Sequence, residues 1–109
     1  LISGSLPSEL GQIKELQGLW LDSNKFNGTI PTELGQLDSI QFLLLYDNEL
    51  TGTIPLELDG LADTILQFDV SQNRLNGQVP EGLCHLNQSM LKFDCSALLC
   101  GCHCGCDTV

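Results

Sequence analysis

Residues 16–37 read LQGLWLDSNKFNGTIPTELGQL, and this stretch decides the fold because its pattern returns along the chain. A tetrapeptide Gly-x-(Leu/Ile/Val)-Pro marks each return. It occurs at spacings of 24, 24 and 25 residues, as Gly4–Pro7, Gly28–Pro31, Gly52–Pro55 and Gly77–Pro80. A fixed period of this length is typical of a solenoid, in which each repeat forms one coil and stacked coils share a core.

Two further sequence features recur with the same period. Apolar pairs two positions apart are typical of a short strand with one buried face, and an Asn follows each pair. The pairs are Leu19/Leu21, Leu43/Leu45 and Phe68/Val70, and the asparagines are Asn24, Asn48 and Asn73. An Asn side chain both donates and accepts hydrogen bonds, so we expect a structural Asn ladder that satisfies backbone groups of neighbouring coils.

The unit resembles the leucine-rich repeat of the plant-type subclass, with the consensus LxxLxxLxLxxNxLxGxIPxxLGxL. The resemblance implies an α/β fold, a right-handed horseshoe solenoid with a parallel β-sheet on the concave face and short helical or irregular segments on the convex face. We expect the solenoid to span residues 1–97, with repeats near 16–37, 40–61 and 65–86. The sequence begins inside a repeat and has no Met at position 1, and from the missing Met we expect a fragment or a processed product.

The carboxy-terminal end departs from the pattern. A partial repeat is expected over residues 90–97, with Phe93 and Cys95 in the positions of Phe68 and Val70, followed by a cysteine-rich cap or tail over residues 98–109. We expect disulfides rather than a metal site, because zinc ligands are usually spaced by two to four residues. The cysteines are Cys84, Cys95, Cys100, Cys102, Cys104 and Cys106.

Composition narrows the choice of partners. The chain of 109 residues carries 14 acidic and 4 basic side chains, a formal net charge of −10. This balance argues against binding to nucleic acid and against direct contact with an anionic membrane, since both need clustered Lys and Arg. The longest apolar run, Phe42–Tyr46, is far too short to span a bilayer.

No enzyme motif stands out in the sequence. It contains no Gly-rich phosphate loop, no Gly-x-Ser-x-Gly elbow and no His-Glu-x-x-His, and both histidines, His85 and His103, lie beside cysteines. We therefore expect no catalytic activity, no cofactor and no metal. Weak calcium binding by carboxylates on the concave face is the alternative.

Residues that alternate with the buried leucines are expected on the concave face, in columns across the strands. The columns are Gly18, Phe42, Gln67 and Lys92; Trp20, Leu44, Asp69 and Asp94; Asp22, Tyr46, Ser71 and Ser96; and Ser23, Asp47, Gln72 and Ala97. Aromatic side chains beside carboxylates have the composition of a binding hot spot, and the alternative is scaffold surface partly shielded by adjacent repeats. The predicted ligand-binding residues are Trp20, Asp22, Phe42, Leu44, Tyr46, Asp47 and Asp69.

Two sequons, Asn27-Gly28-Thr29 and Asn87-Gln88-Ser89, predict N-glycosylation at Asn27 and Asn87. With the many cysteines they favour an oxidising, extracellular location. The resemblance implies an extracellular or cell-surface recognition module, part of a receptor-like protein, that binds a protein or peptide, or a polysaccharide, through its concave face. The alternatives are a structural wall or matrix protein and a secreted inhibitor.

Overall fold

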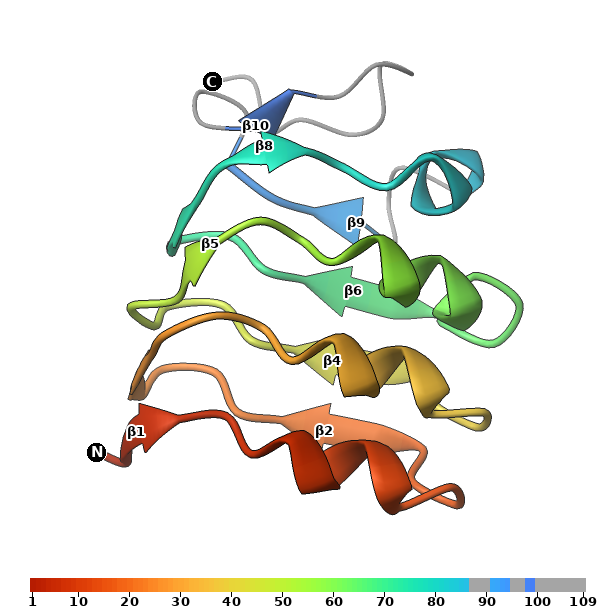
Figure 1. Ribbon diagram of the computed structural model, residues 1–109, viewed down its shortest axis with the longest axis horizontal. Coiled ribbons are helices and arrows are strands. Elements are labelled where there is room, and N and C mark those ends of the chain that lie inside the picture. Colours follow the sequence, from red (N-terminus) through yellow and green to blue (C-terminus); the bar gives the residue numbers. More distant parts are fainter. Residues whose placement is uncertain (87–90, 95–97, 100–109) are drawn as a thin grey trace.

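The chain winds as a stack of coils, each built from a strand, a turn, a second extended segment and a short 3-10 helix (Figure 1). This computed structural model describes residues 1–86, 91–94 and 98–99, with the backbone alone for Cys84, His85, Leu98 and Leu99. The elements are β1 (Ser3–Ser5), η1 (Ser8–Gln12), β2 (Gly18–Trp20), β3 (Lys25–Asn27), η2 (Thr32–Gln36), β4 (Phe42–Leu44), β5 (Thr51–Gly52), η3 (Leu56–Leu61), β6 (Gln67–Asp69), β7 (Arg74–Leu75), β8 (Gly77–Gln78), η4 (Glu81–His85), β9 (Leu91–Lys92) and β10 (Leu98–Leu99).

One strand from each coil joins a four-stranded parallel sheet in the order β2-β4-β6-β9. Leu19 pairs with Leu43, and Leu43 pairs with Phe68, so equivalent residues of successive coils lie side by side. All three side chains are buried on the inner face of this sheet. The predicted solenoid with a parallel sheet is confirmed.

A second row of strand pairs was not predicted. The parallel pairs β1–β3, β5–β7 and β8–β10 follow the turn after the first strand, along the left side of the stack in Figure 1. Gly28, directly after β3, and Gly52 of β5 have φ of +74° and +81°, and glycine is the residue that adopts such values without strain. The pairing of β10 with β8 extends the row to residue 99, past the expected boundary at residue 97.

Each helix begins directly after a proline of the repeated tetrapeptide. Pro31 has φ −63° and ψ 135°, and its carbonyl oxygen accepts a hydrogen bond from the backbone N–H of Leu34 at 3.2 Å, which opens a 3-10 turn. The equivalent bonds recur in the other coils. Among the described residues, no helix has both the length and the hydropathy needed to cross a membrane.

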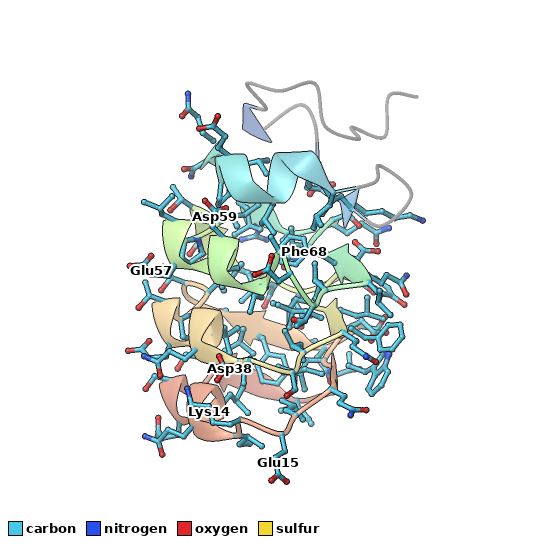
Figure 2. The ribbon with its side chains drawn as sticks, turned by 90° about the vertical axis from the view of Figure 1, so that its right-hand side faces the viewer. Lys14, Glu15, Asp38, Glu57, Asp59 and Phe68 are labelled. Carbon is cyan, nitrogen blue, oxygen red and sulfur yellow. The ribbon has the colours of Figure 1, made fainter. Side chains whose placement is uncertain are left out.

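The core runs through the middle of the stack, between the sheet and the helices. Phe68 of β6 is fully buried there, and Figure 2 shows it between the helical layer and the strands. Each fully buried leucine contributes about 1.5–3 kcal/mol relative to an exposed one. The largest fully buried side chains are Leu34, Leu37, Ile40, Leu43, Leu45, Leu50, Leu58, Leu61, Phe68, Leu83, Leu91 and Phe93.

The repeated asparagines bridge adjacent coils. Asn48 Oδ1 accepts a hydrogen bond from Phe26 N at 3.0 Å, and its Nδ2 donates to the carbonyl oxygens of Leu21, Leu45 and Tyr46 at 2.9, 3.1 and 3.2 Å. The equivalent residues of the neighbouring coils bridge two coils in the same manner. One side chain therefore satisfies backbone groups that the turn would otherwise leave unpaired.

Several predictions fall outside the described residues. They concern the disulfides, the cysteine-rich cap, the glycosylation of Asn87 and the ends of two concave columns. The residues are the side chain of Cys84, together with Cys95, Ser96, Ala97, Cys100, Cys102, Cys104, Cys106 and Asn87.

Candidate functional site

The outer face of the β2-β4-β6-β9 sheet, named here the sheet face, carries the predicted ligand-binding residues. Along β2 and β4, side chains alternate between the core and this face, so Trp20 of β2 lies opposite the inward-pointing Leu19. Gly18 pairs with Phe42, and Trp20 pairs with Leu44, as the predicted columns require.

The last strand corrects the predicted columns. Leu91, not Phe93, pairs with Phe68, and Lys92 pairs with Asp69. Val70 N also donates to Lys92 O at 2.9 Å, so Lys92 continues the column of Asp69 rather than that of Gln67. Residues of a strand alternate with a period of two, so a shift by two leaves the same apolar pattern inside. The sequence pattern therefore could not separate the two registers.

The most exposed aromatic residue of the sheet face is Trp20, whose side chain is 60% exposed. Its ring stacks with that of Phe42, with centroids 5.8 Å apart and planes inclined by 22°. This offset stacking suits the charge distribution of aromatic rings. We name Trp20 and Phe42 the aromatic pair.

Gly18 makes room for the indole, and sequence reasoning did not include it in the site. A Cβ built on Gly18 would lie 2.1 Å from Trp20 Cη2, so the ring lies across the glycine toward the start of β2. The one sequence feature that could have indicated its role was the presence of a glycine in the same column as Phe42 and Gln67. Any larger residue at this position would displace the indole.

Two predicted ligand-binding residues are buried rather than exposed. Leu44 is 9% exposed, although it lies outside the main core cluster. Asp69 is 7% exposed, and its Oδ1 accepts hydrogen bonds from Ser71 N at 3.0 Å and Ser71 Oγ at 2.6 Å. The Asp69 carboxylate is already bonded to Ser71. Because Leu44 and Asp69 are both buried, neither offers much surface to a ligand.

The sheet face is acidic at the end away from the aromatic pair, beyond the last residues of β2 and β4. The Asp22 carboxylate raises the pKa of the Tyr46 phenol above its ordinary value, first through a side-chain hydrogen bond and then through its charge. Asp69 and Asp47 contribute smaller charge effects in the same direction. A negative charge opposes the loss of the phenol proton, so the shift reports a negative potential around this hydroxyl group. We name Asp22, Tyr46 and Asp47 the acidic end.

One carboxylate of the acidic end, that of Asp47, has no partner among the described residues. Asp47 is exposed, and its side chain forms no hydrogen bond or ion pair within the described part of the chain. By contrast, both carboxylate oxygens of Asp94 accept backbone N–H groups, from Gln72 at 3.0 Å and Asn73 at 3.2 Å. Among the described residues, no three His, Cys, Asp or Glu side chains group together as metal ligands.

The repeats match a known family. The leucine-rich repeat model matches residues 15–37, 39–61 and 64–86. The chain is a leucine-rich repeat protein. No curated protein sequence matches this leucine-rich repeat chain.

Solved structures resemble this leucine-rich repeat protein closely in fold. The BIR2 ectodomain from Arabidopsis thaliana is 29% identical, with a TM-score of 0.81 over 98% of this chain and 55% of that one. The complex of BIR3 and SERK2 from Arabidopsis thaliana contains a chain 33% identical, with a TM-score of 0.70 over 82% and 47%. The plant peptide hormone receptor RGFR1, in complex with RGF2, is 35% identical, with a TM-score of 0.74 over 90% and 15%. The leucine-rich repeat chain thus spans about half or less of these neighbours.

Proposed function

We propose that this chain is a recognition module of an extracellular receptor-like protein and binds a protein or peptide partner through the sheet face. The observation that carries the proposal is the aromatic pair, because Trp20 remains 60% exposed while stacked on Phe42. Tryptophan and tyrosine supply large contact areas with little rotamer entropy to lose, and they dominate binding energy once a partner excludes water.

The structural neighbours support a binding role. One neighbour was solved as the plant peptide hormone receptor RGFR1 with RGF2, and another as a complex between BIR3 and SERK2. These are interactions of longer proteins. The proposal that this chain has a similar binding role rests on the shared repeats and on the exposed aromatic pair. The two sequons and the cysteines favour the same extracellular setting.

A non-catalytic role agrees with the chemistry of the sheet face. Of its carboxylates, Asp69 accepts hydrogen bonds from the backbone N–H and the hydroxyl group of Ser71, and Asp22 raises the pKa of the Tyr46 phenol. Recognition of a partner needs no catalytic group, because shape complementarity and buried contact area supply the binding energy.

A displayed library of random 12-residue peptides tests the proposal. Peptides retained by the wild-type chain should bind Trp20→Ala about 30-fold more weakly, the loss expected for a hot-spot residue. Far-ultraviolet circular dichroism checks that the variant folds. Glu33→Gln with Glu57→Gln, on the helices, should leave binding unchanged.

The outcomes separate the competing functions. Retained peptides that bind Trp20→Ala as well as the wild type would move the site away from the sheet face. A library that yields no specific peptide would contradict peptide recognition and favour the structural wall or matrix alternative. Selective retention of an oligosaccharide array in place of peptides would favour a polysaccharide partner.

A further inference from the structure

The sheet face is divided along its strands into two chemically different ends. The indole of Trp20 leans over Gly18 and stacks on Phe42, so the aromatic pair covers the starts of β2 and β4. The acidic end follows these strands, with Tyr46 four residues beyond Phe42. At about 3.3 Å per residue, the two ends are about 13 Å apart.

The two ends also differ in what they leave unsatisfied. The aromatic pair exposes apolar surface and no charge. At the acidic end, Ser23 N donates a hydrogen bond to Tyr46 O at 3.0 Å, so Asp22 and Tyr46 lie on adjacent coils, and Asp47 forms no hydrogen bond or ion pair with any described residue. The cation on the described strands of this sheet is Lys92 of β9, which pairs with Asp69 and lies three strands away from β2.

Charge complementarity then identifies the group that suits the acidic end. A neutral ligand would leave the carboxylates without a counter-charge, and an anionic ligand would be repelled in a chain of net charge −10. A guanidinium or ammonium group can approach Asp22 and Asp47 together, and charge-assisted hydrogen bonds to carboxylates are roughly twice as strong as neutral ones.

We propose, on the basis of the proposed function, that the partner is a basic peptide segment that lies along the strands of the sheet face. An Arg or Lys side chain of this segment binds the carboxylates of Asp22 and Asp47. An apolar side chain about four residues away in the extended segment packs on Trp20 and Phe42. The aromatic pair supplies contact area, and the acidic end selects the charge and the direction of the segment.

The composition of selected peptides tests this proposal. The displayed 12-residue library is selected in parallel on the wild type, on Asp22→Asn with Asp47→Asn, and on Glu33→Gln with Glu57→Gln. Both double variants remove two negative charges, so they have the same net charge. Asn tolerates the positive φ of Asp47, so the first variant should keep the backbone.

Peptides from the wild type and from the glutamate variant should be enriched in Arg and Lys over the unselected library, and the enrichment should disappear on the aspartate variant. A synthetic copy of a selected peptide, with citrulline in place of its Arg, should bind the wild type about fivefold to tenfold more weakly. Trp20 is the single tryptophan, so its fluorescence reports binding at the aromatic pair directly.

Three outcomes overturn the basic-peptide proposal. Peptides that need Trp20 but show no basic enrichment would leave the proposed function intact and contradict the charge selection. Basic enrichment that persists on the aspartate variant would assign the attraction to another acidic surface. The absence of any selected peptide would contradict both proposals together.

Discussion

Gly82 of η4 leaves the space that the carboxyl group of Asp59 of η3 occupies. A Cβ built on Gly82 would come within 2.7 Å of Asp59 Cγ. In the preceding coils the arrangement is reversed, because Gly35 lies against the backbone of Glu57, at the helix positions equivalent to Asp59 and Gly82. Figure 2 labels Asp59 and Glu57 on the helical layer. At this pair of helix positions, one of the two facing residues is thus a glycine in both contacts.

The cost of filling these spaces should depend on what stands opposite. A Cβ on Gly35 would lie 2.2 Å from the carbonyl oxygen of Glu57, which cannot move without shifting a coil. We expect Gly35→Ala to lower the free energy of unfolding by about 1–3 kcal/mol, as overpacking usually does. Gly82→Ala should cost less, because the Asp59 side chain can rotate away. Urea denaturation gives both values, and the reverse order would contradict the packing account.

The Asn ladder should lose stability unevenly along the stack. Asn48 bonds to backbone groups inside two coils, so Asn48→Ala should cost about 1–3 kcal/mol through unpaired polar groups. Asn24 accepts its bond between coils from the exposed Ile2 N–H, which water can replace, so Asn24→Ala should cost less. Chemical denaturation of the two variants makes the comparison. Equal losses would mean that the bonds between coils do not determine the cost.

Tyr46 should titrate above the ordinary phenol pKa of 10.0, because Asp22 raises its pKa. It is the single tyrosine, so phenolate absorbance follows this group alone. Asp22→Asn should lower the observed pKa. The interaction of Asp22 with the protonated phenol favours the folded state below pH 10.0, and its contribution is lost as the pH rises through the raised pKa of Tyr46. If the pKa of Tyr46 is unchanged in Asp22→Asn, the Asp22 carboxylate does not act on the Tyr46 phenol.

Gly18→Ala should displace the Trp20 indole without removing it. The added methyl group would lie 2.1 Å from Cη2, and the indole is exposed and free to turn aside. The near-ultraviolet circular dichroism of the stacked pair should weaken, while the far-ultraviolet spectrum stays the same. Binding of a selected peptide should fall with it. A variant with an unaltered aromatic signal would show that the indole does not lie over Gly18 in solution.

Asn27 should carry an N-linked glycan when the chain is made in a eukaryotic secretory host. Its side chain is exposed on β3, beside the buried Phe26, so a glycan would point to solvent. Removal of N-glycans should therefore lower the mass of the protein, and Asn27→Gln should lower it by one glycan. Thr29→Ala removes the same sequon and serves as the matched control. An unchanged mass for Asn27→Gln would contradict the assignment.

The sequence by itself determined the coil and its core. The period of the Gly-x-(Leu/Ile/Val)-Pro tetrapeptide predicted stacked repeats, and the alternation around Leu19 and Leu43 identified a parallel sheet with one buried face. These inferences succeed because each repeat must bury the same apolar positions against its neighbours. The sequence of each repeat therefore shows which of its positions pack in the core.

The tertiary structure alone decided the register and the surface. The period of two hid the shift that pairs Leu91 with Phe68, because either register buries alternate residues. Alternation also states which side of the sheet a residue faces but not how much its neighbours cover it, so Leu44 was predicted exposed and is buried. The position of the Trp20 ring over Gly18 depends on the direction of one side chain, which no pattern of residue types specifies.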